Sequence, residues 1–113
     1  MRTGLLAIVF VLALASSGGS QNIRYHQTLT PVTNAAAQSL STCVADVSVN
    51  FAYISIETTD CRWWDDGTAP TAATGHLAPV GRTLTIQGHS NVVNFQVIST
   101  GANATVIASC GRP

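Results

Sequence analysis

Lysine is missing from this chain of 113 residues, and charged side chains of every kind are scarce. Five arginines balance five acidic residues, and only 9% of all residues are charged. Nucleic-acid-binding proteins need clustered basic side chains on one face, so this composition argues against a nucleic-acid partner. A near-neutral surface also repels copies of itself only weakly, which favours a homo-oligomer.

Two other good helix formers are almost as rare: the chain has one methionine and one glutamate. Threonine and serine are abundant instead, with 14 and 10 residues. This balance favours strands and turns over helices. A chain of this length has room for one domain with one hydrophobic core.

Alternation of apolar and polar side chains predicts about six short strands, separated by turn signals every eight to twelve residues. In the clearest one, Val47, Val49, Phe51 and Tyr53 are expected to share a face, with the second half covered on both sides. Pro31 is expected to end the first strand. The fold class is therefore all-β: a small antiparallel β-sandwich or barrel of six to eight strands. The expected strands are 22–29, 47–57, 61–64, 83–87, 92–99 and 104–110, with a helical turn as one option at 35–38.

The first twenty residues differ in character from the rest. A short basic start, an apolar run at 4–15 and small residues after it have the order of a secretory signal peptide. The alternative is an uncleaved apolar arm that is buried against a partner chain. The run is too short for a comfortable membrane span, which needs roughly 20 residues. Residues 1–20 are thus assigned to this segment and its Gly/Ser linker, and 21–113 to a single β domain without a stable membrane span.

Three cysteines leave at least one thiol without a partner in the same chain. Cys61 and Cys110 both fall in predicted strands, and they are the expected disulfide if the chain is exported. The alternative is that Cys43, Cys61 and Cys110 are all small buried side chains in a reducing compartment. Their spacing does not match a zinc site.

Catalytic patterns are weak throughout the sequence. Asp65 and Asp66 are adjacent, so in an extended chain their carboxylates point to opposite faces and do not converge on one substrate. His26, His76 and His89 are isolated, and neither a nucleophile motif nor a phosphate-binding glycine loop is present. We therefore expect no enzymatic activity, no metal and no cofactor.

Trp63 and Trp64, next to Arg62, form the conspicuous aromatic element. Neighbouring strand residues face opposite ways, so one tryptophan is expected in the core and the other outward, where it can contact a sugar or a protein. The alternative is that a loop buries both. Arg62 is expected to hold the following loop by pairing with Asp65 or Asp66, which makes residues 62–66 the predicted interaction site.

The segment 34–110 resembles a family of small virion structural proteins of tailed bacteriophages. The most specific block is Arg-Trp-Trp-Asp-Asp-Gly-Thr-Ala-Pro-Thr at 62–71. Weaker blocks lie in order around it, at 36–40, 54–57, 75–77, 80–81, 94–98 and 102–106. The resemblance implies a virion component such as a head decoration (cement) protein or an accessory tail piece, with the major capsid protein or other virion proteins as partners.

The apolar start and the cysteines at 43, 61 and 110 depart from the pattern of that family. They leave a second interpretation open, in which the chain is an exported bacterial binding module derived from a prophage. Such a module would be secreted or periplasmic after signal-peptide cleavage, and it would recognise glycan or protein through an exposed tryptophan.

Overall fold

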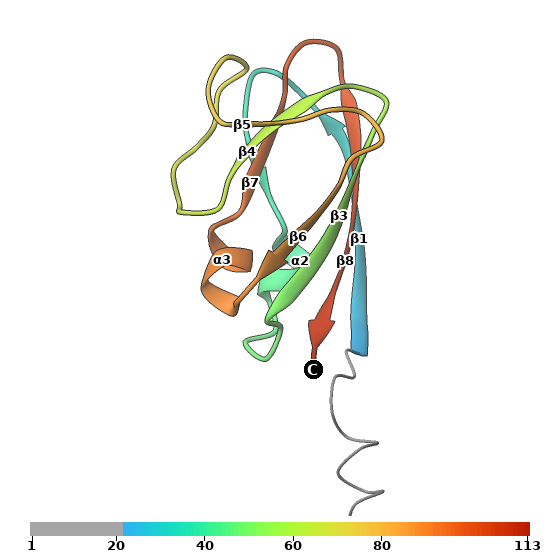
Figure 1. The fold of residues 1–113 in the computed structure, drawn as a ribbon, viewed down its shortest axis with the longest axis vertical. Helices are drawn as coiled ribbons and strands as arrows, with labels where there is room; N and C mark the ends of the chain where they lie inside the picture. Colours follow the sequence, from blue (N-terminus) through green and yellow to red (C-terminus); the bar gives the residue numbers. More distant parts are fainter. Residues whose placement is uncertain (1–21) are drawn as a thin grey trace, which may run out of the picture.

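Alternating side chains build two antiparallel four-stranded sheets that pack face to face (Figure 1). The computed structural model describes residues 22–113, and the predicted signal peptide or apolar arm at 1–20 lies outside the described residues. The prediction of a small antiparallel β-sandwich is confirmed. Sheet A has the order β1 (Asn22–Val32), β8 (Ala104–Arg112), β3 (Phe51–Glu57), β6 (Thr83–Gln87). Sheet B has the order β2 (Gln38–Ser39), β7 (Gln96–Ser99), β4 (Cys61–Trp64), β5 (His76–Ala78).

The core lies between the sheets and is filled from both. On β3 the inward side chains are Ala52, Ile54 and Ile56, each no more than 1% exposed. Full burial of an isoleucine side chain stabilises a fold by about 1.5–3 kcal/mol. The other buried members of this cluster include Leu29, Val32, Leu40, Val49, Val92, Phe95, Val97, Val106 and Ala108.

The prediction that Val47, Val49, Phe51 and Tyr53 share a face is wrong, because Val47 is 83% exposed and Val49 is fully buried. The second half of β3 is also not covered on both sides, since Tyr53 is 36% exposed on the outer side. Strand β3 begins only at Phe51. Before it, Ser48 and Val49 donate their backbone N–H groups to Asp46, at Oδ1 and at the carbonyl oxygen. This turn breaks the period of two, because its residues do not alternate between faces.

Strand β1 does not end at Pro31 as predicted but continues to Val32. It is the outermost strand of sheet A on its side, so the missing N–H of a proline does not interrupt a bond to a neighbouring strand. The pairing with β8 shifts between Leu29 and Val32, at the point where Pro31 is accommodated.

Two short helices occupy places where the sequence pattern is misleading. The turn at 35–38 is not helical, and α2 (Ser41–Val44) forms further on. The predicted strand 92–99 divides into α3 (His89–Asn94) and β7. Gly88, at φ 93°, allows the sharp entry into α3, because glycine has no Cβ to clash there. Among residues 22–113, no helix is long and apolar enough to cross a membrane.

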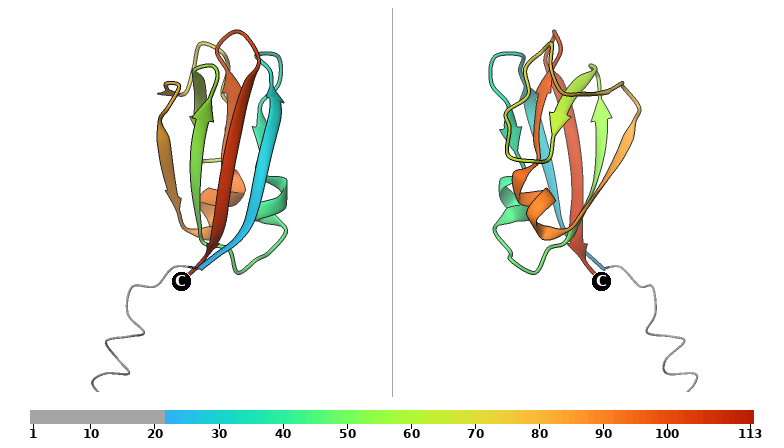
Figure 2. Two further views of the ribbon diagram at one scale, coloured as in Figure 1. Left: turned by 90° about the vertical axis from the view of Figure 1, so that its right-hand side faces the viewer. Right: turned by 60° about the vertical axis from the view of Figure 1, so that its left-hand side comes forward.

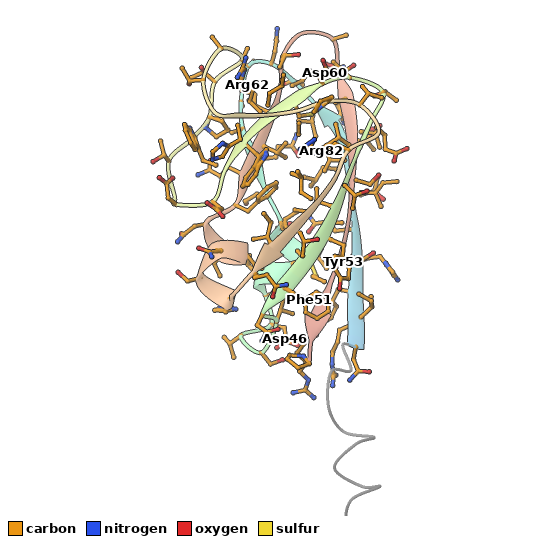
Figure 3. All side chains as sticks on the ribbon, viewed as in Figure 1. Asp46, Phe51, Tyr53, Asp60, Arg62 and Arg82 are labelled. Carbon is orange, nitrogen blue, oxygen red and sulfur yellow. A yellow bond between two sulfur atoms is a disulfide. The ribbon has the colours of Figure 1, made fainter. Side chains whose placement is uncertain are left out.

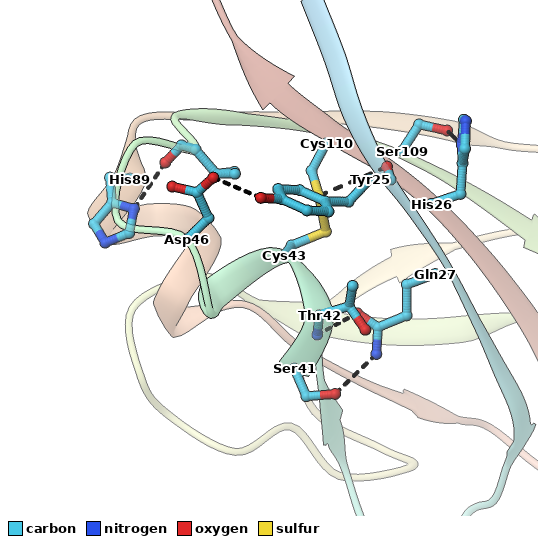
Figure 4. The surroundings of a disulfide bond; sticks show 11 residues. Tyr25, His26, Gln27, Ser41, Thr42, Cys43, Asp46, His89, Ser109 and Cys110 are labelled. Atoms are coloured by element: carbon cyan, nitrogen blue, oxygen red, sulfur yellow. Dashed lines mark hydrogen bonds between the residues drawn. A yellow bond between two sulfur atoms is a disulfide. The ribbon is translucent and has the colours of Figure 1, made fainter.

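The disulfide joins Cys43 to Cys110, with their Cα atoms 6.0 Å apart (Figure 4), and Cys61 is a buried free thiol. The predicted pair of Cys61 with Cys110 is therefore wrong. Cys110 lies beside Ala52 near the start of β3, whereas Cys61 follows the far end of that strand. At about 3.3 Å per residue, the length of β3 separates the two thiols, and α2 brings Cys43 to β8 instead.

Disulfide mapping checks this pairing. We expect a non-reduced digest of the oxidised protein to link the peptides of Cys43 and Cys110 and to leave Cys61 as a thiol. Burial, with a smaller contribution from Asp60, raises the pKa of Cys61 to about 11, so this thiol is expected to be alkylated only after denaturation. A Cys61–Cys110 peptide would contradict the structure.

Removal of the disulfide also has a predictable cost. It closes a loop of 67 residues, so chain entropy assigns it about 4 kcal/mol, and measured values for native bridges are about 2–5 kcal/mol. We expect the double variant Cys43→Ala/Cys110→Ala to lose about that much unfolding free energy in urea. Cys61→Ala, which leaves the bridge intact, is the control and should lose less.

Asp46 ties the turn before β3 to strand β1 (Figure 4). Its Oδ2 accepts the Tyr25 hydroxyl at 2.7 Å, and its Oδ1 accepts the N–H and hydroxyl of Ser48 at 2.8 and 2.7 Å. The hydrogen bond from the Ser48 hydroxyl, followed by that from Tyr25, lowers the pKa of Asp46 to about 2. These bonds favour the ionised carboxylate.

This depressed pKa predicts an acid sensitivity. Stability from Asp46 is fully present above the ordinary carboxyl pKa near 4 and is lost as the pH falls towards 2, because the unfolded state then binds the proton more readily. We expect Asp46→Asn to lower the unfolding free energy at pH 7 and to reduce the loss between pH 5 and pH 2. Denaturant unfolding at both ends of that range measures the difference. Equal pH slopes in the two proteins would contradict the assignment.

Candidate functional site

The predicted interaction residues 62–66 lie at the end of β4 and at the start of the loop that joins β4 to β5. Strand β4 carries Arg62, Trp63 and Trp64 between β7 and β5. The connection of residues 65–75, here called the β4–β5 loop, runs outside sheet B (Figure 1), and Arg62 is labelled beside it in Figure 3.

Arg62 holds the β4–β5 loop, but not through an ion pair. Its Nε donates to the carbonyl oxygen of Ala72 at 3.3 Å, and its Nη1 donates to that of Gly75 at 3.0 Å. The predicted pairing with Asp65 or Asp66 is therefore wrong. Asp65 is an odd number of residues after Arg62, so in an extended chain the two side chains point to opposite faces of the sheet. The guanidinium fork suits two neighbouring carbonyls.

Asp66 caps the turn at the start of the loop. Its Oδ1 accepts the N–H of Thr68 at 2.9 Å, and this hydrogen bond is the main cause of the lowered pKa of Asp66. Gly67 follows with φ 88°, and its N–H donates to the carbonyl of Asn94 at 3.3 Å. The turn is thus fastened to the end of α3, while its own side chains stay at the surface.

Two threonines and a glycine fix the second half of the loop. Thr71 and Thr74 exchange backbone hydrogen bonds of 3.0 and 3.2 Å, and their hydroxyls lie 2.7 Å apart. Gly75 has φ 125°, and a Cβ on it would lie 3.2 Å from both Pro70 Cβ and the Trp63 carbonyl oxygen. The loop therefore packs back onto β4 at a point where only glycine fits without strain.

The two tryptophans flank His76. Both rings have their centroids 4.9 Å from the imidazole, and Trp63 also packs on Phe95 at 5.8 Å. Trp63 joins the core, as the opposite-face prediction expects of one of the pair, yet both indoles are only partly buried. His76 is missed by sequence reasoning because its place opposite Trp63 depends on the β4–β5 register, which no local pattern reveals.

The other histidines have structural partners elsewhere. His26 Nδ1 lies 2.8 Å from the Ser109 hydroxyl, and His89 Nδ1 lies 2.7 Å from the Val49 carbonyl oxygen (Figure 4). Within residues 22–113, no group of three or more His, Cys, Asp or Glu side chains is placed to hold a metal ion. The candidate site is a polar loop, fastened to β4 and α3 by hydrogen bonds, beside a cluster of two indole rings and one imidazole.

No family model, curated protein or solved structure matches this chain.

The Arg62 contacts predict which substitution loosens the β4–β5 loop. Lysine cannot reproduce the two-pronged donation of the guanidinium, so we expect Arg62→Lys to reduce stability by about 1–2 kcal/mol. We also expect faster hydrogen exchange of the Thr71, Ala73 and Thr74 amides, which are hydrogen-bonded in the closed loop. Exchange measured by NMR or mass spectrometry reports both effects.

Arg82→Lys is the matched control, since it makes the same substitution in the connection before β6. It should leave loop exchange unchanged. Unaltered exchange of residues 71–74 in Arg62→Lys would show that Arg62 does not hold the loop.

Proposed function

We propose that this chain is a non-enzymatic structural protein of a tailed-bacteriophage particle, acting as a capsid decoration or accessory component. The observation that carries the proposal is the β4–β5 loop, an exposed polar segment held in one conformation on a nearly uncharged β-sandwich. In this role the protein resides in the virion, and it binds the major capsid protein or another virion protein through the loop and the adjacent Trp64.

The fixed shape of the loop favours such a contact. Binding surfaces lose affinity when loops and side chains must be ordered on association. Here Arg62, Asp66 and the Thr71–Thr74 pair impose that order in the free protein. A particle that repeats one weak contact many times gains affinity from each reduction of this cost.

The chemistry of the loop suits a protein partner. Asp66, Gly67, Thr68 and Ala69 are exposed near its start, and the half-buried Trp64 lies two residues before Asp66. Aromatic side chains with a polar surround are typical of the energetically important part of a protein interface. The resemblance of 62–71 to phage virion proteins supports the same partner class.

The test has two stages. Mass spectrometry of purified particles is expected to find this chain at a fixed number of copies, and its absence from them would refute the proposal. Asp65→Arg reverses the charge of the first residue of the loop, whose side chain does not fasten it. We expect this variant to bind particles lacking the wild-type chain at least about tenfold more weakly.

Glu57→Arg makes the same charge change on sheet A and is the matched control. It should keep binding to particles within about twofold of wild type, provided that both variants retain the native circular dichroism spectrum. Equal loss in the two variants would place the contact somewhere other than the loop.

One observation favours a second candidate, an exported binding module. The Trp63–His76–Trp64 cluster presents partly exposed rings of the kind that stack on sugars. A mature protein beginning at Ser16 and recovered outside the cytoplasm, with Trp64→Ala abolishing glycan or protein binding, would support this candidate over the virion component.

A further inference from the structure

The four edge strands of the sandwich differ in how well they are protected. The edge strands are β1 and β6 in sheet A, and β2 and β5 in sheet B. An edge strand presents unpaired backbone N–H and C=O groups, which can pair with another chain unless the protein blocks them. β2 and β5 are short, with two and three residues, and they offer little to pair with.

The edge of β1 is obstructed. Its ladder with β8 shifts at Ile23/Tyr25 and again at Leu29/Val32, and Pro31 removes a donor. Helix α2 also lies beside it, fixed by the Gln27 side chain, which bonds the Ser41 hydroxyl and the Thr42 N–H. In the left view of Figure 2, α2 lies next to β1 on the outer side of that strand. These are the devices by which natural sheets prevent edge-to-edge association.

The hydrogen-bond pattern of β6 can be followed from its two ends. At one end Ile56 N–H donates to Arg82 O at 3.0 Å, and at the other Gly88 N–H donates to Asn50 O at 2.6 Å. Bonding partners alternate along an antiparallel pair, so Leu84 and Ile86 face β3 with their backbone groups. The backbone groups of Thr83, Thr85 and Gln87 therefore point away from sheet A.

Nothing within β6 blocks that edge. Residues 83–87 contain no proline and no charge, and the pairing with β3 is in unbroken register. The left view of Figure 2 shows β6 as the outermost strand on its side of sheet A. Among the described residues, one hydrogen bond reaches the outer side of β6: the Asn91 side-chain amide donates to the Gln87 carbonyl oxygen at 2.8 Å, and that oxygen can accept a second hydrogen bond.

We propose that β6 pairs with β6 of a second copy of this chain, antiparallel, about a two-fold axis through Thr85. Thr85 then faces its own counterpart, and Thr83 faces Gln87 in both directions. Each of the three residues donates one backbone N–H and accepts one across the axis. The two copies of sheet A join into one continuous sheet, and this pairing is independent of the β4–β5 loop and of any phage partner.

A second copy fits this edge better than an unrelated strand for two reasons. The edge is self-complementary. Its three outward backbone positions are centred on Thr85, so a two-fold axis through Thr85 pairs each of them with one of the same three positions in the second copy. It is also uncharged, so no like charges meet across the axis.

The test compares two threonine-to-lysine variants in the full chain. In Thr85→Lys, two lysines face each other across the axis, and like charges opposite one another disfavour strand pairing. Thr28→Lys makes the same change on β1, at another outward and exposed threonine of an edge strand. Both changes cost similar strand propensity, so the pair isolates the position of the charge.

Sedimentation equilibrium is expected to give a dimer for wild type and for Thr28→Lys. Thr85→Lys is expected to dissociate at least about tenfold more readily. Amide exchange gives a second readout: the Thr83 and Thr85 amides should become protected as protein concentration rises, whereas Leu84 should be protected at every concentration.

Three results would overturn the proposal. They are a wild-type monomer up to roughly 1 mM, a dimer that survives Thr85→Lys, and equal dissociation by Thr28→Lys. If β6 pairs instead with a strand of a different protein, the purified chain stays monomeric, and the first result follows. Native circular dichroism spectra of both variants exclude unfolding as the cause of dissociation.

Discussion

The burial of one face of β3 against sheet B is the constraint on which the other features depend. Ala52, Ile54 and Ile56 are removed from water together, and the same strand pairs with β8 on one side and β6 on the other. Because side chains alternate in a strand, fixing this face also fixes the outward one and the backbone register of both neighbours. This register sets Cys110 of β8 beside Ala52.

Sheet B is positioned by this core but contributes shorter strands. Its four strands have two, four, four and three residues, while those of sheet A have 11, nine, seven and five. The β4–β5 loop therefore cannot rely on a long ladder for its shape. It depends on individual hydrogen bonds: Arg62 donates to backbone carbonyls, and Asp66 accepts the backbone N–H of Thr68. A loop held in this way can change its surface residues while the sandwich beneath it keeps its fold.

Sequence reasoning reaches those features of this fold that are local. Period-two alternation identifies the strands at 61–64, 83–87 and 104–110 and the all-β class, because each depends on neighbouring residues alone. It wrongly expects Val47 and Val49 to share a face, because a turn fastened by Asp46 resets the phase just before β3. It also misses α3, where Val92 is buried and Val93 is 41% exposed, a contrast that fits a strand and a short helix equally well.

In the candidate site, too, the sequence predicts what is local and misses what depends on distant residues. Residues 62–66 are contiguous, so the sequence can single them out, and the structure places them together at the end of β4. The actual partners of Arg62 are the carbonyls of Ala72 and Gly75, and His76 reaches the tryptophans through the β4–β5 register. Backbone carbonyls carry no sequence signature, and strand register depends on how the whole sheet assembles. The cysteine pairing fails for the same reason, since it depends on which end of β3 each thiol lies near.

An unprotected edge in a chain with so few charges raises the question of why association would stop at two copies. Lysine is the usual side chain that keeps sheet edges apart, and this sequence has none. The answer lies in the asymmetry of sheet A. A two-fold pairing through β6 uses the open edge of both copies. The joined sheet then ends in a β1 strand on each side, and each β1 edge is obstructed by Pro31, by register shifts and by α2. An isologous contact of this kind closes on itself, whereas a contact between β6 and β1 would continue from copy to copy into a fibre. The blocked β1 edge and the open β6 edge are thus two parts of one arrangement that permits a dimer and prevents further growth.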